Sequence, residues 1–352
     1  MFNCIMSAPV EPFPLDFVNR YRTIGLPTSL IPEQIEEMLS REINVDGEFQ
    51  KICVCGMGAS AIAGDIFTDY ANEVAKKPVN VIRGVDLPHW VDSNTLALIT
   101  SYSGETLETL ELFRQALSCG THVITISSGG KLSRMSQENG ILNVAISPGI
   151  QPRAAFGYIF GAISSIMDDL GICPARKELT RILPNLKDLR DSMMPDVFDN
   201  GAIELARSLL GTIPVVYGHP NMSASALRWK TQIHENAKMM SFSGIMPEFN
   251  HNEIVGWIEG DPTNRCSPVI LYDTNASATL KGIVDTTVKS LRESGVEVHE
   301  VFIEGQSSLE KNLRSSLIGD FVSLYLAVLR NVDPEKVDPI VSLKKRLSHI
   351  FN

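Results

Sequence analysis

The 352-residue sequence predicts an α/β protein made of two three-layer αβα domains with parallel, flavodoxin-like sheets. Short apolar runs alternate with stretches of helical periodicity, which is typical of a parallel sheet that helices cover on both faces. The pattern also occurs twice. V-C-G-M-G-A-S-A at residues 54–61 is similar to V-V-Y-G-H-P-N-M-S-A-S-A at residues 215–226, and each predicts a strand, a glycine turn and the start of a helix.

Five apolar runs in the first half are predicted to form one sheet. Apolar residues recur at helical spacing from Ile62 to Val74, after the first run, and from Leu107 to Leu117, after the third. A longer helix is expected at residues 152–169, because Pro152 suits a first helical position. The predicted strands are residues 51–55, 79–83, 95–101, 122–127 and 141–146.

The alternation begins again after residues 173–200, a charged segment with several prolines that is interpreted as a partly helical connection between domains. We therefore place the first domain at residues 1–172, with a leading segment at residues 1–20, and the second domain at residues 201–352. The predicted elements of the second domain are strands at residues 213–217, 269–272 and 296–303 and helices at residues 223–238, 276–294 and 309–330.

The composition excludes several classes of function. A formal net charge of −10 is the opposite of what nucleic-acid binding requires, so we expect no nucleic-acid partner. The six cysteines form no C-x-x-C pair and have no histidine at zinc spacing, which predicts no metal site. The chain has neither a signal peptide nor an apolar run of the ~20 residues that span a membrane. We therefore expect a cytoplasmic protein without a membrane partner.

A glycine-containing motif directly follows the first predicted strand. In Gly56-Met57-Gly58-Ala59-Ser60, glycines let backbone N–H groups approach an anion, and the positive end of the next helix adds to the attraction. The motif lacks the third glycine of a dinucleotide fingerprint, so we expect no cofactor. A tight structural turn is the alternative interpretation of so short a motif.

A second polar motif, T-S-Y-S-G-E-T at residues 100–106, ends the third predicted strand. The hydroxyl groups of Ser101, Ser103 and Thr106 form a neutral donor cluster suited to a phosphate. Helix capping by Ser103 or Thr106 is the structural alternative. Because both motifs end strands of one sheet, at the edge where open α/β sheets bind ligands, we expect them to bind one anion together.

These two loops resemble those of the sugar isomerase (SIS) domain, whose serine-rich loop holds a sugar phosphate. Three longer strings are similar to the bifunctional phosphoglucose/phosphomannose isomerase family. They are P-R-A-A-F-G-Y at residues 152–158, R-W-K-T-Q-I-H-E-N-A-K at residues 228–238 and E-F-N-H-N-E at residues 248–253. The resemblance implies two SIS-type domains, hexose 6-phosphate substrates bound at residues 58–60 and the three hydroxyl groups, and a homodimer with a shared active site.

The resemblance also implies four catalytic residues. Glu235 matches the base that moves a proton between C2 and C1, and Arg153 matches the cation that stabilises the enediolate. His251 and Lys344 match the residues that open the sugar ring, the histidine acting in the site of the partner subunit. Without the resemblance, Glu235 and Lys344 would be solvated helix residues, Arg153 a helix-start arginine and His251 a loop histidine bonded to its neighbours.

The helix predicted at residues 223–238 carries Glu235 on a polar face. Arg228, Gln232 and Glu235 are spaced i, i+4 and i+7, so they share one side of the helix. We expect them to project away from the apolar stripe that contains Trp229.

Four departures from the family pattern bear on the prediction. Ala59 and Ala63 replace glycines, which narrows the phosphate loop. Glu105 replaces an asparagine, so its carboxylate must face away from a phosphate or be paired. Glu335 replaces a threonine, which puts the phosphomannose activity, rather than the phosphoglucose activity, in question.

The sequence therefore predicts an aldose–ketose isomerase that interconverts glucose 6-phosphate and fructose 6-phosphate, and also mannose 6-phosphate and fructose 6-phosphate, by metal-free proton transfer. One alternative is a phosphosugar-binding regulatory protein, which the joint presence of Glu235, His251 and Arg153 disfavours. The other is an isomerase of a related phosphosugar.

Overall fold

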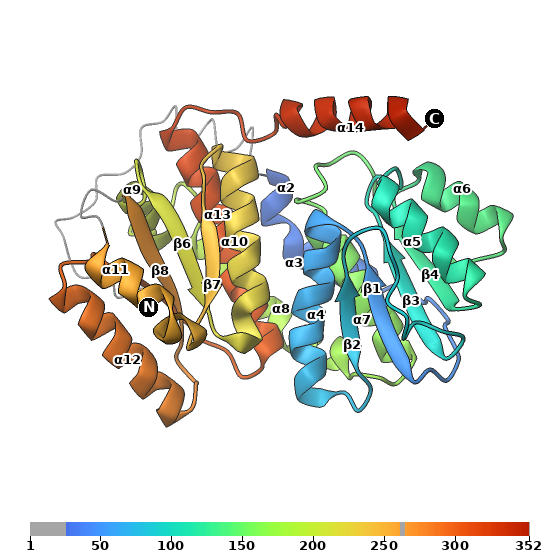
Figure 1. Cartoon of the computed structure of the whole chain (residues 1–352), viewed down its shortest axis with the longest axis horizontal. Helices are drawn as coiled ribbons and strands as arrows, with labels where there is room; N and C mark the ends of the chain where they lie inside the picture. The colour runs from blue at the N-terminus through green and yellow to red at the C-terminus, as the bar shows by residue number, and fades with distance from the viewer. Residues whose placement is uncertain (1–25, 261–264, 352) are drawn as a thin grey trace.

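Two parallel sheets, one in each half of the chain, form the frame of the computed structural model (Figure 1). The structure describes residues 26–260 and 265–351, so the predicted leading segment at residues 1–20 lies outside the described residues. Helices cover both faces of each sheet. This arrangement confirms the predicted fold class.

The first sheet has the strand order β2-β1-β3-β4-β5, and all of its pairs are parallel. Alternate residues of its central strands face opposite cores: Ile52 and Val54 pack into one core, and Cys53 and Cys55 into the other. All four side chains are fully buried, so the strand has a continuous apolar sequence. The strands are β1 (Lys51–Cys55), β2 (Val79–Ile82), β3 (Thr95–Thr100), β4 (His122–Ser127) and β5 (Asn143–Ala145).

The helices around the first sheet are α2 (Leu26–Ser29), α3 (Ile31–Leu39), α4 (Gly58–Val74), α5 (Leu107–Ser118), α6 (Gly130–Glu138) and α7 (Phe156–Asp169). Helices α3, α4 and α7 pack on one face, and α5 and α6 pack on the other. The helix predicted from Pro152 begins at Phe156, because residues 152–155 form turns in which the amides of Ala154 and Ala155 donate to the carbonyl of Gln151.

The second sheet has the order β7-β6-β8-β9 and is also parallel. Its strands are β6 (Ile213–Gly218), β7 (Phe242–Ile245), β8 (Cys266–Asp273) and β9 (His299–Ile303). Its helices are α9 (Gly201–Ser208), α10 (Ser223–Ala237), α11 (Glu253–Glu259), α12 (Ala278–Glu293) and α13 (Ser308–Leu329). Helices α9, α10 and α13 cover one face of this sheet, and α11 and α12 cover the other.

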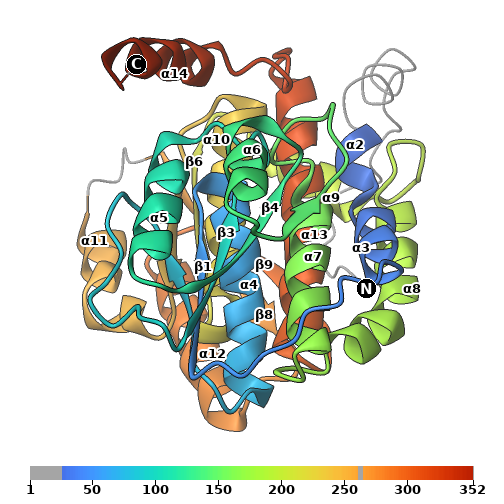
Figure 2. The ribbon, with the colours of Figure 1, turned by 90° about the vertical axis from the view of Figure 1, so that its right-hand side faces the viewer.

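The connecting segment is more regular than its sequence indicates. Most of it forms α8 (Ala175–Ser192), which continues through Pro184. Leu179, Leu183 and Leu186 on this helix are buried in the core of the first domain, so tertiary packing outweighs the cost of the proline. Figure 2 shows α3, α7 and α8 along one side of the molecule.

Several elements lie outside the predicted ranges, among them α3, α6, α9, α11 and β7. Strand β7 is short, contains a glycine and lies at the edge of its sheet, so its sequence carries little of the strand pattern. Helix α14 (Asp338–Phe351) follows α13 and lies across one end of the molecule in both views (Figures 1 and 2).

The two domains meet through helices, and α4 of the first domain packs against α10 and α13 of the second (Figure 1). Asp69, near the carboxyl end of α4, accepts a hydrogen bond from Asn312, near the amino end of α13 (Nδ2–Oδ2 3.1 Å). The carboxyl ends of α10 and α13 lie side by side. Arg330, which follows α13, donates to the carbonyl of Lys238, which follows α10 (Nη1–O 3.1 Å). The amino end of α4 therefore lies at the same end of the interface as the carboxyl ends of α10 and α13.

No helix within residues 26–260 and 265–351 has both the length and the apolar character that crossing a lipid bilayer requires.

One carboxyl group in the domain interface is unusually hard to ionise. Burial raises the pKa of Asp69 to about 7, although the hydrogen bond from Asn312 opposes the rise. An unfolded aspartate ionises near pH 4. Between these two values the folded state binds more protons than the unfolded state, so the free energy of unfolding falls as the pH rises.

We expect Asp69→Asn to remove this pH dependence. At pH 5 the variant and the wild-type chain differ little, whereas at pH 8 the variant gains on the order of 2–4 kcal/mol relative to the wild-type chain. Urea denaturation at the two pH values measures the difference, with the exposed Asp86→Asn as the matched control. If the free energy of unfolding depends on pH in the same way for Asp69→Asn and the wild-type chain, the raised pKa of Asp69 is contradicted.

Candidate active site

The loop after β1 leads into α4, whose first turn has no side-chain cap. Met57, the residue before the helix, makes no side-chain capping bond, and Gly58 has a φ of +53°. A Cβ atom on Gly56 would lie 2.5 Å from the hydroxyl of Thr100, so the loop sits directly against the end of β3. Ala63 is fully buried in the core, so this departure from the family pattern lies outside the loop.

The loop after β3 is held in shape by its own hydroxyl groups. The amide of Gly104 and the hydroxyl of Thr106 both bond to Oγ of Ser101, at 3.2 and 3.1 Å. Thr106 precedes α5 but makes no side-chain capping bond, and Ser103 bonds only to the amide of Glu105 (3.3 Å). The capping alternative therefore does not describe this loop.

The carboxylate of Glu105 turns away toward the next helix. Its Oε1 atom accepts the backbone amide of Lys131 (2.8 Å) and lies 3.8 Å from the Nη2 atom of Arg134. The carboxylate of Glu105 is thus paired, which is one of the two arrangements expected for it.

A third loop, which follows β4, completes this edge of the sheet and was missed in the sequence. Ser128 donates to the carbonyl of Tyr102 (2.6 Å), and Gly104 packs so closely on Gly129 that a Cβ atom would lie 1.9 Å from its carbonyl oxygen. The signal was the string S-S-G-G at residues 127–130, which begins on the last residue of the predicted strand at residues 122–127.

Arg153 and Glu235 meet across the domain interface. Arg153, in the turn before α7, is 5% exposed, and its Nη1 atom lies 3.3 Å from Oε2 of Glu235 on the last turn of α10. Its Nε atom donates to Oδ1 of Asn236 (2.7 Å), and its Nη2 atom donates to the carbonyl of Pro334. Glu235 is therefore a paired carboxylate with its side chain 31% exposed, not an isolated solvated one.

Burial lowers the pKa of Arg153, and the carboxylates of Glu235 and Glu335 oppose this change. An arginine starts from so high a pKa that the group stays cationic. The site thus presents a fixed positive charge beside a carboxylate that solvent can reach.

The anion loops and the Arg153–Glu235 pair lie at the same end of the molecule. The loop after β1 opens α4 at its amino end, and Glu235 lies at the carboxyl end of the antiparallel α10. Helix α14 lies at this same end (Figure 1). It carries Lys344, whose side chain is exposed.

His251 lies at the opposite end of the second domain. The amide of Met246, which follows β7, donates to the carbonyl of Gly218, the last residue of β6 (2.9 Å), so the segment that leads to His251 starts where α10 begins. Glu235 is roughly 18 Å further along that helix. The exposed His251 is therefore not beside Glu235 within one chain.

The polar face of α10 is buried at Arg228 and Gln232 and partly exposed at Glu235. Arg228 and Gln232 share a side with Glu235, as predicted, but both are about 1% exposed and pack against α13. Trp229 is also fully buried, since α10 lies between the second sheet and the helices at the interface.

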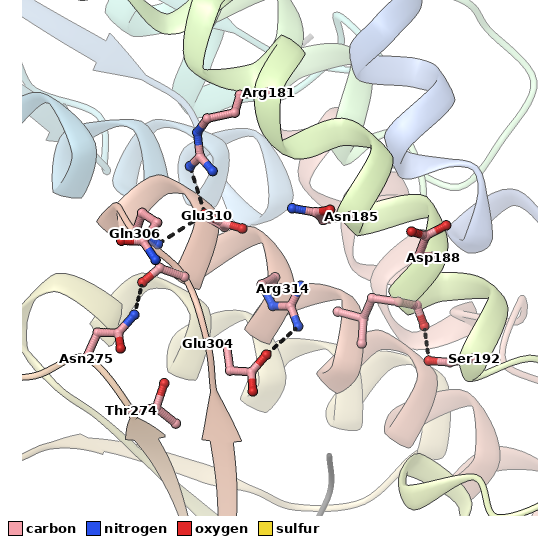
Figure 3. A pocket seen from close by; sticks show the side chains of 12 residues that line it. Arg181, Asn185, Asp188, Ser192, Thr274, Asn275, Glu304, Gln306, Glu310 and Arg314 are labelled. Atoms are coloured by element: carbon pink, nitrogen blue, oxygen red, sulfur yellow. Dashed lines mark hydrogen bonds and ion pairs between the residues drawn. The ribbon is translucent and has the colours of Figure 1, made fainter.

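A polar cavity of about 730 Å³ lies away from these residues, between α8, α13 and the loops after β8 and β9 (Figure 3). Both of its arginines are already paired: Arg181 contacts Glu310 at 2.8 Å, and Arg314 lies 3.7 Å from Glu304. None of the predicted site residues lines this cavity, so it is not the predicted anion site.

Within the described part of the chain, no group of three or more His, Cys, Asp or Glu side chains is arranged to hold a metal ion.

Two parallel sheets with glycine- and serine-rich loops at a carboxyl edge define the class of SIS-domain proteins. The SIS domain family matches residues 48–165, and the family of the bacterial phospho-glucose isomerase C-terminal SIS domain matches residues 198–347. The chain belongs to the bifunctional phosphoglucose/phosphomannose isomerase family.

The sequence relatives cover nearly the whole chain. The bifunctional phosphoglucose/phosphomannose isomerase of Caldicellulosiruptor bescii is 34% identical over 91% of this chain and 97% of the relative. The bifunctional phosphoglucose/phosphomannose isomerase of Aquifex aeolicus is 34% identical over 85% of this chain and 91% of the relative. The crystal structure of a hypothetical protein from Thermus thermophilus matches with a TM-score of 0.73 at 15% identity, covering 94% of this chain and 92% of that chain, and shows the shared fold alone.

Because Gly104 packs tightly against Gly129, the loop after β3 has no room for a methyl group at residue 104. We expect Gly104→Ala to lower the free energy of unfolding by about 2–4 kcal/mol, because the Cβ atom meets a backbone carbonyl at a positive φ. Gly140 has a similar φ of +65° but open space around it, so Gly140→Ala is the matched control, with an expected loss of about 1 kcal/mol. If urea denaturation shows that Gly104→Ala and Gly140→Ala lower the free energy of unfolding equally, the steric argument is refuted.

Proposed function

We propose that the protein interconverts glucose 6-phosphate and fructose 6-phosphate, and mannose 6-phosphate and fructose 6-phosphate. The observation that carries this function is the pairing of Arg153 with Glu235 at the end of the domain interface where the anion loops lie. A carboxylate beside a buried guanidinium suits proton transfer through an anionic intermediate. The names of the relatives support the same reaction.

The phosphate group of the substrate binds to the loops after β1 and β3. The backbone amides of residues 58–60 and the hydroxyl groups of Ser60, Ser101, Ser103 and Thr106 donate to its oxygens. The amino ends of α4 and α5 add a positive potential, and neither helix has a side-chain cap that would compete with the anion.

Glu235 moves the proton. Its carboxylate removes the proton from C2 of the open-chain aldose, and the electrons of the C–H bond form the C1–C2 double bond of an enediolate. The guanidinium of Arg153 stabilises the negative charge on the oxygens. Within the enediolate the hydroxyl proton on O2 moves to O1. Glu235 then returns its proton to C1, which leaves the carbonyl group at C2 and a hydroxyl group at C1 and completes the ketose without a metal or cofactor.

His251 and Lys344 open the sugar ring by moving a proton between the C1 hydroxyl group and the ring oxygen. Since His251 lies far from Glu235 in its own chain, it acts in the site of a second copy. Apolar side chains close to His251 in the chain are exposed, with Ile245 41% and Val255 57% exposed, which supports burial against a partner. We therefore propose a cytoplasmic homodimer with shared sites.

Glu335 lies beside this site and bears on the choice between glucose and mannose substrates. Its own backbone carbonyl accepts from Gln151 (3.2 Å), and the carbonyl of the preceding Pro334 accepts from Arg153 and Lys238. A carboxylate in this loop lies within electrostatic reach of Arg153. The relative rates on the two aldoses therefore depend on this residue.

Glu235→Gln should retain the fold and sugar-phosphate binding but lose activity, because an amide cannot accept the proton from C2. We expect kcat to fall at least about 1,000-fold with little change in binding. A coupled assay with both aldose 6-phosphates, in the presence of EDTA, measures turnover, and Glu293→Gln on α12 is the control. Near-normal activity in Glu235→Gln would remove the base assignment, and a loss of wild-type activity in EDTA would contradict the metal-free mechanism.

A shared site predicts complementation between two inactive variants. We expect Glu235→Gln and His251→Ala to be inactive alone, while a mixture unfolded and refolded together recovers about a quarter of wild-type activity, from one intact site in each mixed dimer. Refolding each variant separately before mixing is the control. If no activity returns although mixed dimers form, His251 acts within its own chain or not at all.

A further inference from the structure

An arginine that this reaction scheme does not use lies fully buried between the domains. Arg228 is 1% exposed and forms an ion pair with Asp320 of α13, which is 0% exposed (Nη2–Oδ2 2.6 Å). Gln232 donates to the other oxygen of Asp320 (Nε2–Oδ1 2.7 Å). Removing two charges from water costs free energy, and an apolar pair of similar size is often at least as stable. This ion pair therefore needs an explanation other than stability.

The guanidinium of Arg228 also holds the main chain at Arg153. Its Nη2 atom donates to the carbonyl of Arg153 at 3.2 Å, and its Cζ atom lies 4.2 Å from the centre of the Phe156 ring. Phe156 is the first residue of α7 and is fully buried. Arg228 thus contacts the turn that carries Arg153 and also the start of the helix that follows it.

The second domain consequently holds Arg153 along its whole length. Arg228 holds its carbonyl, Asn236 accepts from Nε, and Pro334 accepts from Nη2. The remaining nitrogen, Nη1, faces Glu235 at 3.3 Å. A shift of the main chain at Arg153 would move this nitrogen relative to the carboxylate.

We propose that Arg228, with Asp320 as its counter-ion, is a positioning residue that sets the place of the Arg153 guanidinium opposite Glu235. The inference rests on the proposed isomerase function, in which Arg153 stabilises the enediolate. Arg228 touches no reacting atom and acts through Arg153 alone. Because enediolate charge develops only during the reaction, a displaced guanidinium weakens the transition state more than the bound substrate, so kcat falls while KM stays nearly constant.

The test uses the full-length chain and measures kcat and KM with fructose 6-phosphate. We expect Arg228→Met to lower kcat about 100-fold with KM changed less than about threefold. A single nitrogen of Arg228 contacts both Asp320 and the Arg153 carbonyl, so Arg228→Lys should restore part of the rate, to within about tenfold of the wild-type value.

A second variant keeps the test valid if a lone buried carboxylate prevents folding. Arg228→Met/Asp320→Asn buries no charge at this position, and we expect it to fold and to show the same loss of kcat as Arg228→Met. Thermal unfolding of each variant establishes that the measured protein is folded.

Asn312→Ala is the matched control at the other end of the same interface. Asn312 is fully buried and donates to Asp69 (3.1 Å) and to the carbonyl of Asn221 (2.6 Å), both of them distant from Arg153 along the helices. We expect this variant to lose stability while its kcat stays within about twofold of the wild-type value.

Two results would overturn the inference: a folded double variant whose kcat is within about threefold of wild type, or an equal loss of kcat in Asn312→Ala. Arg153→Met separates these results from a failure of the proposed function. If the wild-type chain shows no isomerase activity, or if Arg153→Met retains full kcat, the proposed function itself is wrong. If Arg153→Met is impaired and the Arg228 variants are not, only the positioning role fails.

Discussion

The buried guanidinium of Arg153 ties the two domains together, because all of its side-chain partners belong to the other domain. Arg153 belongs to the first domain, and its side chain donates to Glu235, Asn236 and Pro334 of the second. A guanidinium without acceptors does not stay buried, because the cost of removing it from water would be uncompensated. The contacts of Arg153 therefore form only when the two domains pack together through α4, α10 and α13.

The direction of those helices explains why two similar domains make different contributions. Helix α4 runs against α10, so the carboxyl edge of the first sheet lies near the end of α10 that carries Glu235. The corresponding edge of the second sheet contains Lys311, whose ammonium group is paired with Asp273 (2.8 Å) and largely buried. An internal ion pair thus lies at the edge of the second sheet that corresponds to the serine-containing loop of the first.

Local patterns of apolar residues in the sequence predicted most of the fold. The buried strands of both sheets lie within a few residues of their predicted bounds, since a strand buried on both faces has a continuous apolar sequence. Helix α8 and strand β7 depend on their neighbours instead. Pro184 made α8 hard to predict, although packing on the core of the first domain stabilises this helix. Phe242–Ile245 is a strand only because β6 pairs with it. The loop after β4 was missed because S-S-G-G resembles an ordinary turn.

Patterns in the amino-acid sequence predicted the two sheets and the loops that end their strands, and motif resemblance indicated Arg153 and Glu235. These features depend on residues that are close together in the chain. Only the tertiary structure decided that Arg153 meets Glu235, that Glu105 turns toward Lys131, and that Arg228 is buried against Asp320. Each of these contacts joins separate elements of the fold, and no local pattern of side chains specifies which distant partner a charged group will find.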